Sequence, residues 1–307
     1  MELKTHDINN RRLPYVRVST GKRITPQDRD IEIFECLQTH GILSSRYLYD
    51  LTKHIAKDET GLKKRLGDLF HEANTAHGGP YLDRWGDGLR AETSFYQLTD
   101  RAIQVLKDYD LRQPVVHDGW WKHQAMTAAI TASIDLACRE KGFTFIRQDQ
   151  IAAELRVKTD HGPLVPDALF GIRYGDGARY FALEADRASE DMDTIEGKVL
   201  KYRDLIGNTH FKKAYNIPNL ICLIITTNSG RVKNILKRIE QNCKGSEGPG
   251  SNYILVSHIP YFYNIPKYAD PRLKRSALDV PVMDDLMTRP YQRAGRSDFF
   301  IDNPARQ

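Results

Sequence analysis

Apolar residues between positions 25 and 109 recur every three or four residues in three successive segments, a spacing typical of amphipathic helices. Two shorter runs follow in which apolar and polar residues alternate, as they do in strands, and a last helical segment closes the region. The predicted order is therefore three helices, two strands and one helix. The helices are expected at 25–41, 43–53, 58–73 and 99–109, and the strands at 79–87 and 92–99.

Residues suited to helix ends mark the borders of the first two helices. Thr25 is expected as the N-cap of the first helix, with Pro26 at the first helical position, where no N–H donor is needed. Gly41 ends this helix, and the second is expected to begin at Ser44 or Ser45.

This order of elements describes a winged helix, a fold that reads double-stranded DNA by placing its third helix in the major groove. The basic run Lys63, Lys64 and Arg65 falls largely opposite the apolar side of that helix. Arg84 and Arg90 belong to the two-stranded ribbon, whose tip is expected near phosphates. Basic runs are also common on the solvated side of helices, and a winged helix can dock a protein, but the outward position favours contact with DNA.

The first 23 residues carry six basic and two acidic side chains, and the basic ones include Arg11 and Arg12. Pro14 and Gly21 argue against a regular helix or strand in this segment. Two interpretations stay open: a solvated tail, or a basic arm that follows a phosphate backbone beside the winged helix.

After Pro114 the pattern changes to apolar strands that alternate with helices. Helices are expected at 117–142, 190–207 and 229–243, the last capped by Ser229, and strands at 143–148, within 165–187, at 219–227 and at 252–259. This order indicates an α/β sandwich with a mixed central sheet.

The hairpin at 165–187 carries three acidic residues where strands near a core rarely have them. If its turn centres on Gly175 and Asp176, Asp167 lies directly opposite Glu184. Asp186 is two residues further along and projects from the same face as Glu184. Carboxylates this close repel one another unless a cation lies between them, and hard oxygen ligands suit Mg²⁺ or Mn²⁺. The hairpin therefore predicts a metal site made by Asp167, Glu184 and Asp186, provided that the register does not slip.

The next helix places a lysine inside its apolar stripe, which contains Ile195, Val199 and Tyr202. The ammonium of Lys198 either extends to solvent or reaches over the acids, and the acids on the adjoining strand favour the second interpretation. Tyr202 is a conceivable covalent nucleophile, but its central place in the stripe favours a core aromatic.

The segments Val-Pro-Asp-Ala and Phe-Ala-Leu-Glu-Ala-Asp, at 165–168 and 181–186, resemble the PD-(D/E)XK nuclease superfamily. Together with the winged helix and the helix that carries Lys198, the chain over about residues 24 to 230 resembles the replication-relaxation family of plasmid and mobile-element proteins. The resemblance implies that Asp167 and Glu184 hold a metal. Asp186 stands where the superfamily has its lysine, so the resemblance implies Lys198 as the relocated catalytic lysine and Asp186 as an additional ligand.

Four parts are therefore expected: a basic arm at 1–23, a winged-helix domain at 24–113, a restriction-endonuclease-like domain at 114–262 and a C-terminal extension at 263–307. The extension is rich in Pro, Tyr, Arg and Asp, and the sequence does not decide whether it wraps the core, binds DNA or lacks order.

Composition limits the function classes. The chain has 307 residues with a net charge of +5, no apolar run approaches membrane-spanning length, and four scattered cysteines indicate a reducing cytoplasm. The expected function is that of a metal-dependent DNA endonuclease or nickase of a mobile element. The alternative is an inactive nuclease-like DNA-binding regulator or accessory protein. The sequence does not decide whether the protein is a homodimer.

Overall fold

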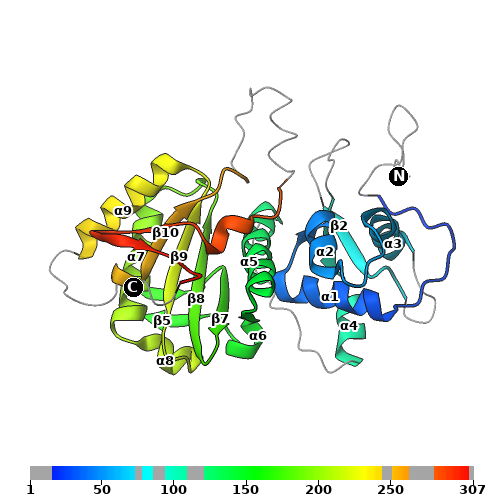
Figure 1. Cartoon of the computed structure of the whole chain (residues 1–307), viewed down its shortest axis with the longest axis horizontal. Helices are drawn as coiled ribbons and strands as arrows, with labels where there is room; N and C mark the ends of the chain where they lie inside the picture. The colour runs from blue at the N-terminus through cyan, green and yellow to red at the C-terminus, as the bar shows by residue number, and fades with distance from the viewer. Residues whose placement is uncertain are drawn as a thin grey trace. The chain divides into compact units, whose positions relative to one another are not determined.

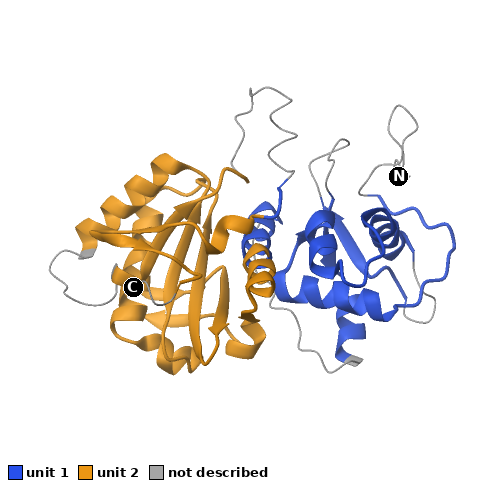
Figure 2. Ribbon diagram, in the orientation of Figure 1, with its two compact units in different colours: residues 1–132, 269–282 blue, residues 133–268, 283–307 orange. Residues whose placement is uncertain are grey.

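The computed structural model describes residues 16–72, 78–85, 94–108, 121–243, 251–262 and 280–303. The chain divides into two compact units (Figure 2), residues 1–132 with 269–282 and residues 133–268 with 283–307. The border falls inside one long helix, α5 (Trp121–Lys141), whereas the sequence placed a domain border at its beginning. Apart from the short strand β1, the first unit matches the expected order of helices and strands. Its elements are α1 (Asp28–His40), β1 (Leu43–Ser44), α2 (Ser45–Thr52), α3 (Glu59–His71), β2 (Leu82–Trp85), β3 (Phe95–Leu98) and α4 (Asp100–Asp108).

A three-stranded sheet in the order β1-β3-β2 accompanies the helices of the first unit. Its core includes the apolar side of α3, with Leu62, Leu66, Leu69 and Phe70 all buried as the spacing predicted. The short strand β1 was not predicted, because two residues are too few to show an alternating pattern.

The start of α1 differs from the prediction of Thr25 as its cap. Gln27 is the N-cap, and its backbone N–H donates to Asp30 at 2.8 Å. The carboxylate of Asp30 thus satisfies a helix-end donor from inside the first turn, which fixes the start at Asp28. Gly41 ends the helix with φ 91°, and the side chain of Ser44 caps α2 at Tyr47 N, both as predicted.

The second unit is built on a seven-stranded mixed sheet in the order β12-β11-β10-β9-β8-β7-β4 (Figure 1), as the sequence predicted in outline. Strands β8, β9 and β10 run parallel, and the other described pairs are antiparallel. The strands of this sheet are β4 (Thr144–Ile146), β7 (Ala168–Tyr174), β8 (Gly177–Asp186), β9 (Ile221–Thr226), β10 (Ile254–His258), β11 (Tyr291–Arg293) and β12 (Arg296–Phe299).

Helices connect the parallel strands. Between β8 and β9 lie α7 (Met192–Gly207) and α8 (His210–Tyr215), and α9 (Ser229–Cys243) connects β9 to β10 and packs against α7. The expected cap of α9 was Ser229, but the side chain of Asn228 accepts from Gly230 N at 2.8 Å, so the cap is one residue earlier.

Several elements of the second unit were not predicted. These are α6 (Gln148–Ile151), the hairpin of β5 (Val157–Thr159) and β6 (Gly162–Leu164), α8, and 3₁₀ turns at Ser251–Tyr253 and Asp284–Met287. The C-terminal extension, whose role the sequence left open, supplies β11 and β12 at one side of the sheet. No helix in the described ranges is both long and apolar enough to span a bilayer.

Candidate active site

The register of the β7–β8 hairpin decides which acidic residues meet. Tyr174 pairs with Gly177 and Ala168 with Leu183, which is the register predicted from a turn at Gly175 and Asp176. Asp167 comes directly before β7, and its backbone N–H donates to Leu183 O at 3.0 Å. Asp167 therefore lies opposite Glu184 along the hairpin, as predicted.

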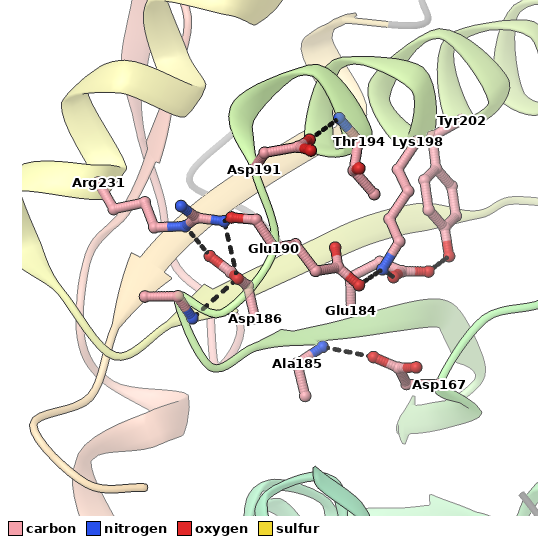
Figure 3. A network of polar contacts seen from close by, with 11 residues as sticks. Asp167, Glu184, Ala185, Asp186, Glu190, Asp191, Thr194, Lys198, Tyr202 and Arg231 are labelled. Carbon is pink, nitrogen blue, oxygen red and sulfur yellow. Dashed lines mark hydrogen bonds and ion pairs between the residues drawn. The ribbon is translucent and has the colours of Figure 1, made fainter. Parts of the chain in front are cut away.

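The carboxylate of Asp167 is held beside the backbone of β8. Its Oδ2 accepts a hydrogen bond from Ala185 N at 2.8 Å (Figure 3). Ala185 follows Glu184 directly, so the two acids are neighbours in space, and the charge of Asp167 raises the pKa of Glu184. One hairpin thus presents two carboxylates at the same end.

Glu184 is buried, with 3% of its surface exposed, and α7 supplies both of its side-chain partners. Tyr202 donates its hydroxyl to Oε1 at 2.5 Å, and the Lys198 ammonium lies 3.1 Å from Oε2. Lys198 and Tyr202 are four residues apart, so they project from one side of the helix. The lysine in the apolar stripe therefore reaches the acids, as the functional interpretation required (Figure 3).

A third carboxylate, which the sequence analysis missed, also contacts this ammonium. Glu190 Oε1 lies 3.1 Å from Lys198 Nζ, while its Oε2 is buried without a hydrogen-bond partner among the described residues. Glu190 lies in the loop between β8 and α7, one residue before the helix cap Asp191. Its position about two helical turns before Lys198 is the feature of the sequence that could have pointed to this contact.

The protonation of these groups follows from burial and from their mutual charges. Burial, and then the charge of Asp167, raises the pKa of Glu184 to about 7, against the opposing effects of Lys198 and Tyr202. Burial alone would lower the pKa of Lys198, but the charges of Glu184, Asp167 and Glu190 outweigh burial and raise it. The ammonium therefore stays charged at neutral pH. Burial and the charge of Glu184 raise the pKa of Tyr202, which keeps its hydroxyl protonated and suits a donor better than a nucleophile.

Carboxylate oxygens are the ligands that a hard divalent cation such as Mg²⁺ or Mn²⁺ prefers. The charges of three carboxylates, Asp167, Glu184 and Glu190, act on a single ammonium, and one buried carboxylate oxygen has no hydrogen-bond partner among the described residues. The ligand atoms of these three acids do not all lie within 4.8 Å of one another in the described part of the chain. Asp167 and Glu184 are the residues that would hold the ion.

Comparison with known proteins identifies the chain. A family model described as replication-relaxation matches residues 34–221. The chain belongs to the replication-relaxation family. This membership indicates a role related to replication or mobilisation and an association with plasmids or mobile elements. No curated protein and no solved structure gave a match.

In this replication-relaxation protein an arginine compensates the charge of Asp186, so this carboxylate does not add to the negative charge of the other acids. Arg231, from the first turn of α9, binds it through Nε and, at 3.1 Å, through Nη2, and Ala188 N donates to it at 2.9 Å. Arg231 also donates to the carbonyl of Glu190 at 2.6 Å. The predicted pocket of three acids is therefore corrected: a guanidinium that follows in sequence 45 residues later neutralises Asp186 (Figure 3).

Another group of potential metal ligands lies elsewhere in the second unit. Among the described residues, three donor atoms within 4.8 Å of one another come from Asp160, Asp204 and His210, and not from the predicted set of acids. Asp204 already accepts from Asp160 N at 2.5 Å and from the side-chain amide of Asn208. This group is accounted for by structural hydrogen bonds.

The residues predicted to contact DNA have different environments in the first unit. Lys63 lies 2.8 Å from Glu59, one helical turn earlier, and Lys64 is exposed. Arg65 instead binds the buried Asp30, with only 10% of its side chain exposed, so it holds α3 against α1.

Of the other four residues predicted to contact DNA, Arg84 lies in the described part of the chain. The guanidinium of Arg84 lies 4.2 Å from the centre of the Phe70 ring, where it packs on α3. Arg11, Arg12 and Arg90 lie outside the described residues.

Proposed function

We propose that this family member is a divalent-metal-dependent DNA endonuclease or nickase of a mobile element, targeted to double-stranded DNA by its first unit. The observation that carries the proposal is the Lys198 ammonium 3.1 Å from Glu184, beside the Asp167 carboxylate of the same hairpin. A lysine over two neighbouring acids is the arrangement that metal-assisted phosphodiester hydrolysis needs.

The architecture supports both halves of the proposal. The order α1-β1-α2-α3-β2-β3-α4 with a sheet β1-β3-β2 supports a winged helix, whose third helix would enter the major groove. In the second unit, an antiparallel hairpin continued by parallel strands suits a restriction-endonuclease-like sheet, with the acids on the hairpin.

Each side chain of the site has a role in this chemistry. A bound divalent ion would polarise the phosphoryl oxygen and lower the pKa of a water molecule. Asp167 and Glu184 would hold the ion, and Tyr202 fixes the orientation of Glu184 through its 2.5 Å hydrogen bond. Lys198 would stabilise the negative charge that develops on the phosphate oxygens.

Conversion of supercoiled plasmid to open circles in Mg²⁺ or Mn²⁺ tests the proposal. Glu184→Gln and Lys198→Ala are each expected to lower the rate by about 100-fold or more, because each removes a charge next to the reacting phosphate. Lys201→Ala, on the same helix but without an ion pair among the described residues, is the matched control and should retain the rate. Nicking that persists in both variants would show that another site or a contaminant is responsible.

A second candidate function is that of a DNA-binding regulator without nuclease activity. Asp186 favours it, since it stands where the nuclease superfamily has a lysine and is bound by Arg231. A wild-type protein that leaves the plasmid intact in either metal but retards a duplex on a gel would decide for the regulator.

A further inference from the structure

An N-terminal strap, which we define as residues 16–22, lies against α3 and β2 in the first unit (Figure 1, the dark-blue segment before α1). Arg17 donates to Phe70 O at 3.1 Å and to Leu82 O at 3.0 Å, and it forms an ion pair with Asp83. Its guanidinium also lies 4.9 Å from the centre of the Phe70 ring. The strap is thus fastened at the junction of α3 and β2.

Uncharged strap residues satisfy a buried carboxylate at the end of α3. Glu72 is 3% exposed and accepts from Ser19 Oγ at 2.7 Å, Thr20 Oγ1 at 2.8 Å and Thr20 N at 2.9 Å. Burial would raise the pKa of Glu72, but the hydrogen bonds from Ser19 and Thr20 outweigh it and lower the pKa. Glu72 is therefore an ionised carboxylate that the strap covers.

The strap also meets α3 one turn earlier. Lys22 forms an ion pair with Asp68, and Val18 N donates to His71 Nδ1 at 3.2 Å. Both acids in the last two turns of this helix region, Asp68 and Glu72, thus have strap residues as partners.

The outward face of α3 lies beside these two acids. Thr60, Lys64, Gly67 and His71 follow one another at helical spacing on the side opposite the buried leucines, and none of them is buried. Among the described residues, no atom beyond the surrounding helix backbone and the chain neighbours of Gly67 lies within 4 Å of where its Cβ would be, so this face is open at its middle. Lys64 gives it a positive charge.

We propose that the strap is part of the DNA-contacting surface, where Lys22 neutralises Asp68 at the edge of α3 and the hydrogen bonds of Ser19 and Thr20 to Glu72 hold the strap in place. An uncompensated carboxylate at Asp68 would lie beside a face that must approach phosphates, and like charges brought together at an interface cost affinity. With Lys22 paired to Asp68, that repulsion is reduced and Lys64 dominates the face. The partner is the phosphate backbone of duplex DNA.

This inference rests on the proposed DNA binding of the first unit, and the test separates the two. Binding of a fluorescein-labelled duplex of random sequence is measured by anisotropy with the full-length protein. The variant Ser19→Ala/Thr20→Ala removes the two hydroxyl donors to Glu72, and so loosens the strap, without changing the net charge. We expect its affinity to fall at least about fivefold, while Thr39→Ala on α1 retains it.

Adding Asp68→Asn to the double variant is expected to restore the affinity, because the carboxylate that the loosened strap no longer pairs with Lys22 is then absent. If the strap variant loses solubility, Lys22→Gln is expected to weaken binding and Asp68→Asn to restore it. Equal affinity of wild type and strap variant, or a loss that Asp68→Asn leaves unrepaired, would overturn the inference while DNA binding stands. A wild type that does not bind the duplex would overturn both.

Discussion

At the scale of single residues, Glu184 is a carboxylate with 3% exposure that lies between an ammonium and a phenol. A buried carboxylate is tolerated only where donors compensate its lost hydration. Its two partners come from one helix, so α7 both stabilises the charge and fixes its orientation. The hydrogen bond from Tyr202 is the part that a conservative substitution can remove without changing the packing.

Tyr202→Phe is expected to lower the free energy of unfolding by about 1.5–3 kcal/mol, the range for a hydrogen bond to a charged group. Urea unfolding in EDTA measures this without any contribution from metal. Tyr215→Phe is the matched control, because that buried hydroxyl donates to a neutral carbonyl, Leu155 O, at 2.6 Å. The loss of unfolding free energy in Tyr215→Phe should be nearer to about 1 kcal/mol. An equal loss in both variants would show that the charge of Glu184 adds nothing.

The stability that Glu72 contributes depends on pH. Its pKa is lowered below the ordinary value of 4.5, so the folded protein binds its proton less readily than the unfolded chain. The stability from this group is present above pH 4.5 and is lost as the pH falls through the lower folded pKa. The stability difference between wild type and Ser19→Ala/Thr20→Ala should therefore shrink on acidification below pH 4.5, as measured by urea unfolding. A difference that stays constant down to pH 3 would contradict this.

At the scale of elements, Arg231 connects the start of α9 to the end of β8. Its side chain is 13% exposed and that of Asp186 is 2% exposed, so the pair is largely desolvated. Arg231 also holds the carbonyl of Glu190 and with it the loop that carries this third carboxylate. The two elements are thus fixed to each other at the edge of the candidate site.

Arg231→Met is expected to destabilise the protein by about 3–5 kcal/mol, since it leaves Asp186 as a buried carboxylate without its cation. Asp186→Asn in the same chain should recover a large part of that loss. Thermal and urea unfolding of the two variants check this expectation. A small loss in the single variant would mean that water already solvates Asp186.

At this scale, the sequence predicted the features that residues close together in the chain determine. The Gly175-Asp176 turn determined the register of β7 and β8, and the apolar spacing of α7 placed Lys198 on the inward side. The pairing of Asp186 with Arg231 was not predictable, because only the fold brings together residues 45 positions apart. The same holds for β11 and β12, which are too short for a pattern.

At the scale of the whole molecule, the two candidate surfaces lie in different compact units. Lys64 and the strap belong to the first unit, and Glu184 and Lys198 to the second. The replication-relaxation match at residues 34–221 includes parts of both units. The match ends before Arg231, so the arginine that pairs with Asp186 lies outside the matched region.

This separation predicts that DNA binding does not depend on the metal site. Duplex binding measured by anisotropy should persist in EDTA and in Glu184→Gln, because the proposed DNA-binding residue Lys64 and the candidate site around Lys198 belong to different units. Lys64→Ala should weaken binding in both conditions and reduce the slope of log affinity against log salt by about 0.9, the value for one lost phosphate contact. If EDTA or Glu184→Gln abolished binding while Lys64→Ala left it intact, DNA would be held by the second unit, and α3 would have to serve another partner.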